Sequence, residues 1–483
     1  MTLPGPIKTD KRLQKALQYV SDYWLPVNAQ VAEKIREGLE GGVYDTNRAL
    51  LTKDLSSDLS LFFGCLRELR EILLERGSKY APQTDLTLII EDVDLDVLKL
   101  ALKSMMEGPS IHLLSEGDEA QVVRLFEAVL SATSAQTLAP GYGAAPGAAL
   151  SLAALRQLGY ALVAWNYPTV YQEALNEVQA DSPHSLDELI AKQLGFTPLL
   201  LASRLATSWG LPAELSEAAL VPSIPMYEDA MIISATTETL SQICRVSEAL
   251  ARAQFDTVYP EARGEWEAAK AEVERRLGPQ GIEKIRERCA AVSQIFLSTS
   301  PDVFRPGLLL DEQHFRGSSP TVRNPYAELC NPALQLKLEQ LYEMIPNSKP
   351  SAKALKFLIR EVIPHAHFSG GCVFTVDPTM CALVPQLEIG TTELRSNQPV
   401  PYLVEDHGDD PVPLAFLTTE GCKPVISENN REGFCSLTSA FGRSQRIGVL
   451  YLEISSKEMK ALDKRALLHF QAINHALVDC LGL

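Results

Sequence analysis

The stretch AALRQLGYALVAW, residues 153–165, decides how this sequence is read. Its apolar residues recur at the three- and four-residue spacing of a helix, but Arg156 and Gln157 stand in its middle. Both side chains are predicted to face inward, where charged and polar groups are costly unless they have hydrogen-bond partners. The stretch therefore predicts a core helix whose two polar residues serve a purpose other than solvation.

Length, composition and charge describe a globular protein of more than one domain. The chain has 483 residues, of which 46% are hydrophobic and 22% charged. A chain of this length usually forms two or three domains. The formal net charge of −17 repels phosphate backbones, and no basic patch offsets it. We therefore expect no nucleic-acid partner.

Hydropathy and cysteine content indicate the cellular compartment of the protein. No run reaches the roughly 20 uninterrupted apolar residues of a membrane span. The basic stretch at residues 8–20 is typical of an amphipathic helix and not of a secretion signal. The nine cysteines are scattered, which favours free thiols in a reducing compartment. These features predict a cytoplasmic protein with no membrane segment.

Two kinds of pattern divide the chain. Helical spacing dominates until about residue 300, and helices then alternate with strand-like runs. We expect an N-terminal helical extension at 1–23, an all-α domain at 24–300, a connecting segment at 301–350 and a smaller α/β domain at 351–483. The Gly-, Ala- and Pro-rich residues 137–149 are interpreted as a long loop within the helical domain. In the α/β domain we expect a mixed sheet flanked by helices.

Two helices of the first domain have clear boundary signals. Ser185 and Glu188 have the spacing of a capping box. Thr197 suits an N-cap, Pro198 the first helical position and Gly210 the C-terminal stop. Helices are therefore predicted to begin after Ser185 and Thr197.

These segments resemble the HDOD domain. The resemblance rests on LRQLGYALVAWNYPTVYQEAL at 155–175, on SLDELIAKQLGFTPLLLASRLATSWGLPAEL at 185–215 and on LLTKDLSSDLSL at 50–61, and it covers roughly residues 24–260. It implies an all-helical bacterial signalling module that is related to the HD metal-dependent phosphohydrolases.

The metal ligands that the resemblance implies for the enzymes are missing. Their His-Asp pair aligns with Arg156 and Gln157, and Pro198 stands where many HDOD sequences carry a histidine. Guanidinium offers no lone pair to a metal, and an amide is a poor ligand. We expect no metal and no catalysis. Arg156 and Gln157 then fill the vacant space as a hydrogen-bonded polar plug, or Arg156 instead reaches solvent from the helix edge.

The C-terminal part, roughly residues 350–483, resembles a GAF domain. The resemblance rests on PLAFLTTEGCKPVIS at 413–427, RIGVLYLEI at 446–454 and the long helix at 455–481. It implies a small sensory module that binds a small ligand or mediates dimerisation. Three strands are then predicted to be neighbours, with the last helix packed on one face of their sheet: Cys372–Val376, Leu383–Ile389 and Ile447–Ile454.

The final helix carries one apolar stripe at three- and four-residue spacing. Its members are Met459, Leu462, Ala466, Phe470, Ile473, Leu477 and Cys480. A stripe of this kind covers a sheet, which is the favoured interpretation. The same stripe could also meet its copy in a homodimer.

Two further clusters in this domain could bind a metal. One contains His365, His367, Cys372, Cys381, His407, Cys422 and Cys435, and the other contains Glu405, Asp406, Asp409 and Asp410. The first matches no structural zinc spacing, and its thiols suit core positions. The second lacks the spacing of a calcium loop and is typical of a solvated acidic loop. We expect neither a metal nor a cofactor.

Together these observations predict a non-enzymatic bacterial signalling protein. The helical domain would bind a protein partner, and the GAF-like domain would sense a small molecule or mediate self-association. One alternative is a divergent HD-type phosphohydrolase acting on a nucleotide or cyclic dinucleotide. A third interpretation is a structural adaptor whose GAF-like domain is empty.

Overall fold

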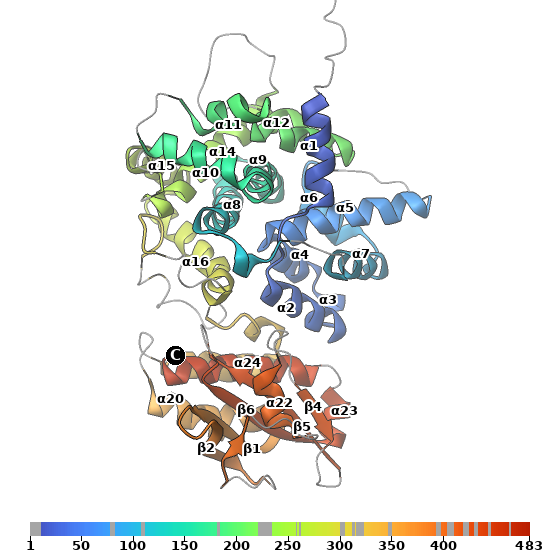
Figure 1. Ribbon diagram of the computed structural model, residues 1–483, viewed down its shortest axis with the longest axis vertical. Coiled ribbons are helices and arrows are strands. Elements are labelled where there is room, and N and C mark those ends of the chain that lie inside the picture. Colours follow the sequence, from blue (N-terminus) through green and yellow to red (C-terminus); the bar gives the residue numbers. More distant parts are fainter. Residues whose placement is uncertain are drawn as a thin grey trace, which may run out of the picture. The chain divides into compact units, whose positions relative to one another are not determined.

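The computed structural model groups the described residues into two units (Figure 1). Unit 1 comprises Met1–Ala32 and Asn47–Phe315, and unit 2 comprises Glu33–Thr46 and Arg316–Leu483. The structure describes residues 11–483 except 78–82, 108–111, 181–183, 221–233, 257, 260–261, 300–304, 312–313, 315–322, 346–349, 393–397, 403–409, 419–424, 429–432, 443–445 and 463–464. This grouping differs from the expected one, because residues 33–46 join unit 2 and the expected connecting segment is shared between the units.

The described secondary structure of unit 1 is helical. Its helices are α1 (Lys11–Asp22), α4 (Arg48–Ser56), α5 (Leu59–Glu75), α6 (Leu86–Asp92), α7 (Leu95–Glu107), η1 (Leu114–Glu116), α8 (Glu119–Leu138), η2 (Ala139–Tyr142), α9 (Pro146–Asn166), α10 (Pro168–Gln179), α11 (Leu186–Leu194), α12 (Pro198–Ser208), α13 (Ala213–Ala219), α14 (Ala235–Arg252), η3 (Ala253–Phe255), α15 (Ala262–Leu277) and α16 (Gly281–Thr299). Helix α2 (Ala29–Glu40) starts in unit 1 and continues into unit 2, where α3 (Val43–Thr46) follows it.

Helices α8 and α9 form the centre of unit 1 (Figure 1). Both are mostly apolar and buried along nearly their whole length, which is typical of helices enclosed by others. Helices α12, α14 and α16 pack around this pair. A residue in the middle of α9 is therefore far from solvent.

The boundary signals of the sequence are confirmed, with one correction. Ser185 and Glu188 form a capping box, the Thr197 side chain caps α12, and Gly210 has the left-handed φ of 68° that ends it. The long loop expected at residues 137–149 is wrong. Helix α8 continues to Leu138, η2 makes a tight turn, and α9 already begins at Pro146 because proline suits a first helical position.

Unit 2 is built on one six-stranded sheet. Its strands are β1 (Phe368–Asp377), β2 (Ala382–Gly390), β3 (Val400–Pro401), β4 (Val425–Glu428), β5 (Phe434–Phe441) and β6 (Gly448–Ser455). Its further helices are η5 (Ala327–Leu329), α19 (Pro332–Tyr342), α20 (Ala352–Phe357), η6 (Leu358–Val362), α21 (Ile363–His365), α22 (Pro411–Leu417), α23 (Ser456–Leu462) and α24 (Arg465–Leu481).

The strand order is β3-β2-β1-β6-β5-β4. The three predicted strands are thus neighbours, as β2, β1 and β6, which confirms that prediction. The expected mixed sheet is wrong, because every described pairing is antiparallel. Short connections explain this result: four residues link β1 to β2 and six link β5 to β6, too few for the crossover that a parallel pair needs.

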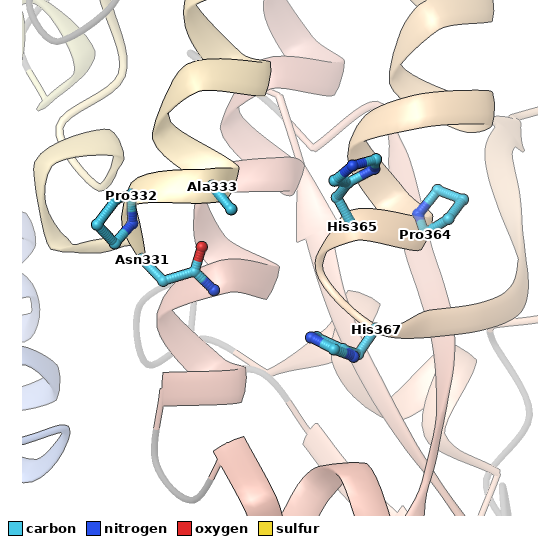
Figure 2. A pocket seen from close by; sticks show the side chains of 6 residues that line it. All are labelled: Asn331, Pro332, Ala333, Pro364, His365 and His367. Carbon is cyan, nitrogen blue, oxygen red and sulfur yellow. The ribbon is translucent and has the colours of Figure 1, made fainter.

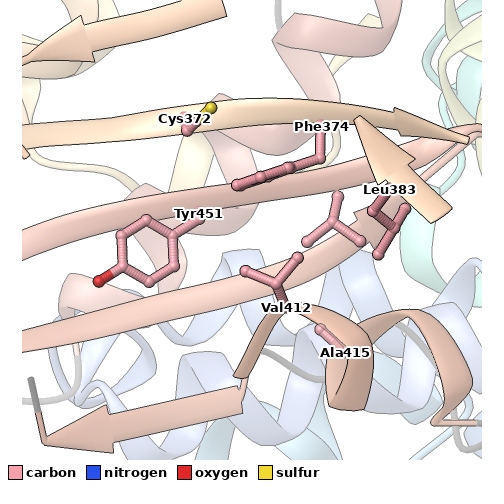
Figure 3. Close-up of a cluster of buried hydrophobic side chains, with 7 residues drawn as sticks. Cys372, Phe374, Leu383, Val412, Ala415 and Tyr451 are labelled. Carbon is pink, nitrogen blue, oxygen red and sulfur yellow. The ribbon is translucent and has the colours of Figure 1, made fainter. Parts of the chain in front are cut away.

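Different helices pack on the two faces of the sheet. Val412 and Ala415 of α22 pack on one face, in a cluster with Phe374 and Leu383 (Figure 3). Helix α24 packs on the other, as predicted, and its Asn474 side chain donates to the Ala440 carbonyl at 3.2 Å. The last helix therefore belongs to the core of unit 2.

The apolar stripe of the final helix is used within the chain. Ala466, Phe470, Ile473, Leu477 and Cys480 are buried, while Met459 and Leu462 are half-buried. The segment containing α19 contacts another side of α24, where Tyr342 donates to Asp479 at 2.8 Å. The stripe thus packs intramolecularly, and a homodimer stays a prediction.

Candidate functional site

The stretch AALRQLGYALVAW, residues 153–165, is part of α9, a helix that is buried along nearly its whole length. It is the one described helix whose length and hydropathy would suit a membrane span, but 94% of the qualifying window is buried within the protein. That burial is typical of a core helix. Arg156 and Gln157 are 1% and 2% exposed. The inward orientation predicted for both is therefore confirmed.

Arg156 is held by Glu248 of α14. Its Nε donates to Oε1 at 2.6 Å and its Nη2 donates to Oε2 at 3.2 Å, which is the bidentate geometry of a strong ion pair. Its Nη1 also donates to the Ala219 carbonyl of α13 at 3.3 Å. Arg156 thus joins three helices and fills the core as a hydrogen-bonded group, without reaching solvent. The expected hydrogen-bonded plug is not complete, because the buried Oε1 atom of Gln157 has no hydrogen-bond partner.

Electrostatics keep Arg156 ionised. Burial alone lowers the pKa of Arg156, but the charge and hydrogen bonds of Glu248 outweigh it, and the pKa is raised above its ordinary value. The side chain therefore stays positive at every relevant pH. A positive charge at this point repels a metal cation.

A second polar layer adjoins Arg156. Tyr160, one turn further along α9, shares a hydrogen bond with Asp187 at the start of α11. Burial raises the pKa of Asp187, while the hydrogen bond from Tyr160 and the charge of Arg156 lower it. One carboxylate oxygen of Asp187 has no partner. Asp187 and Glu248 thus bring two carboxyl groups to this buried region.

The network continues into α8. Arg124 lies 3.0 Å from the carboxylate of Glu127, and both residues are buried. Tyr259 donates to Glu127 at 2.8 Å, and the Arg124 guanidinium lies 4.8 Å from the centre of the Tyr160 ring. The two arginine–glutamate pairs are therefore connected through Tyr160.

Pro198 lies on the same side of α9. It starts α12, where Thr197 caps the helix by accepting from the Leu200 amide at 3.1 Å. A Cβ on Gly159 would lie 2.0 Å from the Pro198 carbonyl oxygen, so the two backbones are in direct contact. The structure thus brings Pro198 close to the RQLG stretch.

In the part of unit 1 that the structure describes, the chemistry here is that of ion pairs. No group of three or more His, Cys, Asp or Glu side chains among the described residues is arranged to hold a metal ion. The guanidinium of Arg156 has no lone pair for a metal, the proline side chain has no ligand atom, and the amide of Gln157 is a poor ligand. What the arrangement can do is fix α8, α9 and α14 against one another.

The histidines singled out in the C-terminal part line a shallow pocket of about 710 Å³ (Figure 2). His365 and His367 lie apart on one side of it, and Asn331, Pro332 and Ala333 lie opposite. The Nδ1 atom of His365 is 2.7 Å from the Glu361 carbonyl, and that of His367 is 3.1 Å from Glu458. The two imidazoles thus face separate partners.

The described cysteines of that cluster do not line this pocket. Cys372 lies in the sheet core (Figure 3), where burial raises the pKa of its thiol to about 11. Cys381, in the turn between β1 and β2, and Cys435, in β5, are half-buried. His407 and Cys422 lie outside the described residues, as do Glu405, Asp406 and Asp409 of the acidic cluster, while Asp410 caps α22.

The α22 face of the sheet contains a polar end that the sequence analysis did not single out. Glu453 of β6 is fully buried, and its Oε1 accepts from Thr392 at 2.7 Å and from Tyr451 at 3.1 Å. Its Oε2 has no partner, and neither has the hydroxyl of Thr438, which is also fully buried. Glutamate inside an apolar strand, as in GVLYLEIS, is the signal that could have revealed this site.

Sequence reasoning also missed the partners of Arg156. Glu248 lies 92 residues further along the chain, in a helix that has many other polar residues. Arg124 and Glu127 are three residues apart on α8, a spacing that on its own suggests a surface pair. The available signal was their position inside an otherwise apolar run.

One known protein family matches part of the chain. Residues 97–224 match the family model of the HDOD domain. No curated protein sequence matches the chain.

Two solved structures are similar in part. One is the MmoQ response regulator from Methylococcus capsulatus, with 18% identity, a TM-score of 0.41, and coverage of 54% of this chain and 96% of that protein. The other is a putative phosphohydrolase from Shewanella amazonensis, with 17% identity, a TM-score of 0.29, and coverage of 59% and 95%. The family match is the finding that identifies part of the chain: residues 97–224 are an HDOD domain.

Proposed function

We propose that this protein is a non-enzymatic bacterial signalling protein of the cytoplasm. In this proposal the HDOD domain binds a protein partner, and unit 2 is a GAF-like domain that senses a small molecule. The observation that carries the proposal is the buried Arg156–Glu248 pair, with an Nε–Oε1 distance of 2.6 Å, at the position that aligns with metal ligands in related enzymes.

Physical chemistry favours a scaffold over a hydrolase. Hydrolysis by a metal centre needs several anionic or imidazole ligands that converge on one point and lower the pKa of a bound water. Here a bidentate ion pair occupies that region, and the Arg156 guanidinium has no lone pair to offer. The pair rigidly connects α9 and α14, which suits a domain that presents a fixed surface.

The test of this proposal is metal content and turnover. Purified protein is expected to hold no stoichiometric metal and to leave phosphodiesters and nucleotides intact when Mn²⁺, Fe²⁺ or Zn²⁺ is added. The double substitution Arg156→His with Gln157→Asp is expected to restore no activity, because Pro198 provides no ligand and the Glu248 region lacks histidines. Manganese-dependent turnover that Arg156→Ala abolishes would establish the hydrolase alternative instead.

The sensory part of the proposal is supported by the sheet of unit 2. A single antiparallel sheet with α24 on one face and α22 on the other resembles the small α/β module expected there. On the α22 face, Glu453 and Thr438 each keep one buried polar atom without a partner. Unpartnered buried polar atoms are costly, and a bound molecule with N–H donors would remove that cost.

This feature predicts a ligand with a cationic or amide-like donor group. Benzamidine, which presents a planar pair of N–H donors, is expected to raise the Tm, whereas benzoate, with the same ring and the opposite charge, is not. At ten times its Kd a ligand adds about 1.4 kcal/mol to stability. The shift is expected to vanish in Glu453→Gln and to persist in Glu388→Gln, which alters an exposed carboxylate of the same sheet. Equal shifts for benzamidine and benzoate would contradict this specificity.

A further inference from the structure

Residues 33–46 belong to unit 2, whereas the rest of the first 300 residues belongs to unit 1. The chain leaves unit 1 after Ala32 and returns to it at Asn47. Between these points it forms most of α2 and all of α3. We call residues 33–46 the strap.

The strap is seated on α24. The Gln471 side chain donates to Glu37 Oε1 at 3.4 Å, and Arg465 Nε donates to the Gly41 carbonyl at 3.5 Å. A Cβ on Gly41 would come within 2.9 Å of the Leu468 side chain, so the backbone of the strap lies close to α24. Positions 465, 468 and 471 are three residues apart and share one helix face.

The contact is well packed. Glu37 and Gln471 are each 3% exposed, and Leu468 and Tyr44 are fully buried. The Tyr44 ring lies against Gly38, where a Cβ would be 2.4 Å from it, so α3 folds back on α2. Removal of the strap would therefore expose a patch of α24 that includes Leu468.

The position of Glu37 in this contact disfavours a charged carboxylate. Glu37 Oε2 is buried and has no partner. Burial raises the pKa of Glu37 to about 8, with the nearby charge of Glu33 acting in the same direction. On the same helix, the charge of Arg36 lowers the pKa of Glu37 and the charge of Glu40 raises it. The hydrogen bond from Gln471 also lowers this pKa. Its carboxyl group is therefore mostly neutral in the seated strap at neutral pH.

We propose that the strap is a pH-sensitive cover on one face of α24 and is released when the Glu37 carboxyl group ionises. The charged carboxylate would be stranded in a buried contact with one oxygen unpaired, whereas in the released strap it is solvated. Release uncovers Leu468 and Gln471, a surface that a protein partner cannot reach while the strap is seated.

The direction of the pH effect follows from the two protonation states. A carboxyl group whose pKa is raised in the seated state binds its proton more tightly there than in the released state. The stabilisation of the seated state is therefore complete below the ordinary pKa of 4.5 and is lost as the pH rises through about 8. His469 of α24 does not share this window, because burial lowers its pKa to about 4.

Hydrogen exchange measured by mass spectrometry on the full chain tests the proposal. After correction for the intrinsic rate, protection of residues 33–46 is expected to fall at least about tenfold between about pH 6.5 and about pH 9.5. Glu37→Gln keeps the side chain neutral and is expected to remove this fall. Glu40→Gln, on the exposed side of the same helix, is expected to retain it.

A second variant separates the strap from the titration. Gly41→Leu places a side chain where Leu468 already lies and is expected to lower protection of the strap at both pH values. The proposal fails if protection of the wild-type strap is independent of pH, or if Glu37→Gln shows the same fall as wild type. It also fails if Gly41→Leu leaves protection of the strap unchanged.

Discussion

Glu248→Ala is expected to lower the free energy of unfolding of unit 1 by about 3–5 kcal/mol. The substitution leaves the guanidinium of Arg156 charged, 1% exposed and without its bidentate partner. Arginine cannot lose its proton to relieve this, so the cost of a buried charge that has lost its carboxylate partner falls on the folded state. Urea unfolding followed by tryptophan fluorescence measures the change.

A matched surface pair provides the control. Arg70 and Glu71 are also 2.6 Å apart, but the Glu71 side chain is 58% exposed. Glu71→Ala is expected to cost less than about 1 kcal/mol, because exposed ion pairs gain little over hydration. If the two substitutions cost the same, the Arg156–Glu248 pair is not buried as described.

The double variant Arg156→Met with Glu248→Met isolates the pairing. It removes both charges and retains side chains of similar length, and replacing a buried ion pair in this way is often neutral or stabilising. Stability close to wild type is expected. A loss as large as that of Glu248→Ala would mean that packing or the hydrogen bond to Ala219, and not the charge, makes Arg156 important.

The helical part of the fold could be predicted because its signals are local. The cap at Ser185 and the cap at Thr197 each lie within three residues of the group they satisfy. The short turn after α8 was missed for the opposite reason. Residues 137–149 have the composition of a loop, but Gly143, with a φ of 69°, lets the chain reverse within a few residues.

The site could be predicted only in outline. That Arg156 faces inward is predicted from its position in an apolar run, but the sequence leaves open whether its side chain reaches solvent. Its partner Glu248 comes from a distant helix, and no local pattern identifies it. The same holds for the strap. Residues 33–46 have ordinary helical spacing, and only the tertiary fold places Glu37 beside Gln471, 434 residues away in the chain. Long-range pairing is the information that a single sequence does not display.

Gly159→Ala is expected to destabilise unit 1 by about 3 kcal/mol, even though alanine is the better helix former. The new Cβ would lie 2.0 Å from the Pro198 carbonyl oxygen and 2.7 Å from its carbon, which are backbone atoms at the start of α12. These atoms cannot turn aside as the end of a side chain can, so α9 and α12 must separate.

Gly264→Ala is the control, because no atom lies within 4 Å of its Cβ position in α15. This second change is expected to stabilise by about 0.5–1 kcal/mol, the ordinary gain for glycine to alanine in a helix. Opposite signs in urea unfolding would show that Gly159 is required by contact with Pro198, whereas two gains would contradict the packing of α9 on α12.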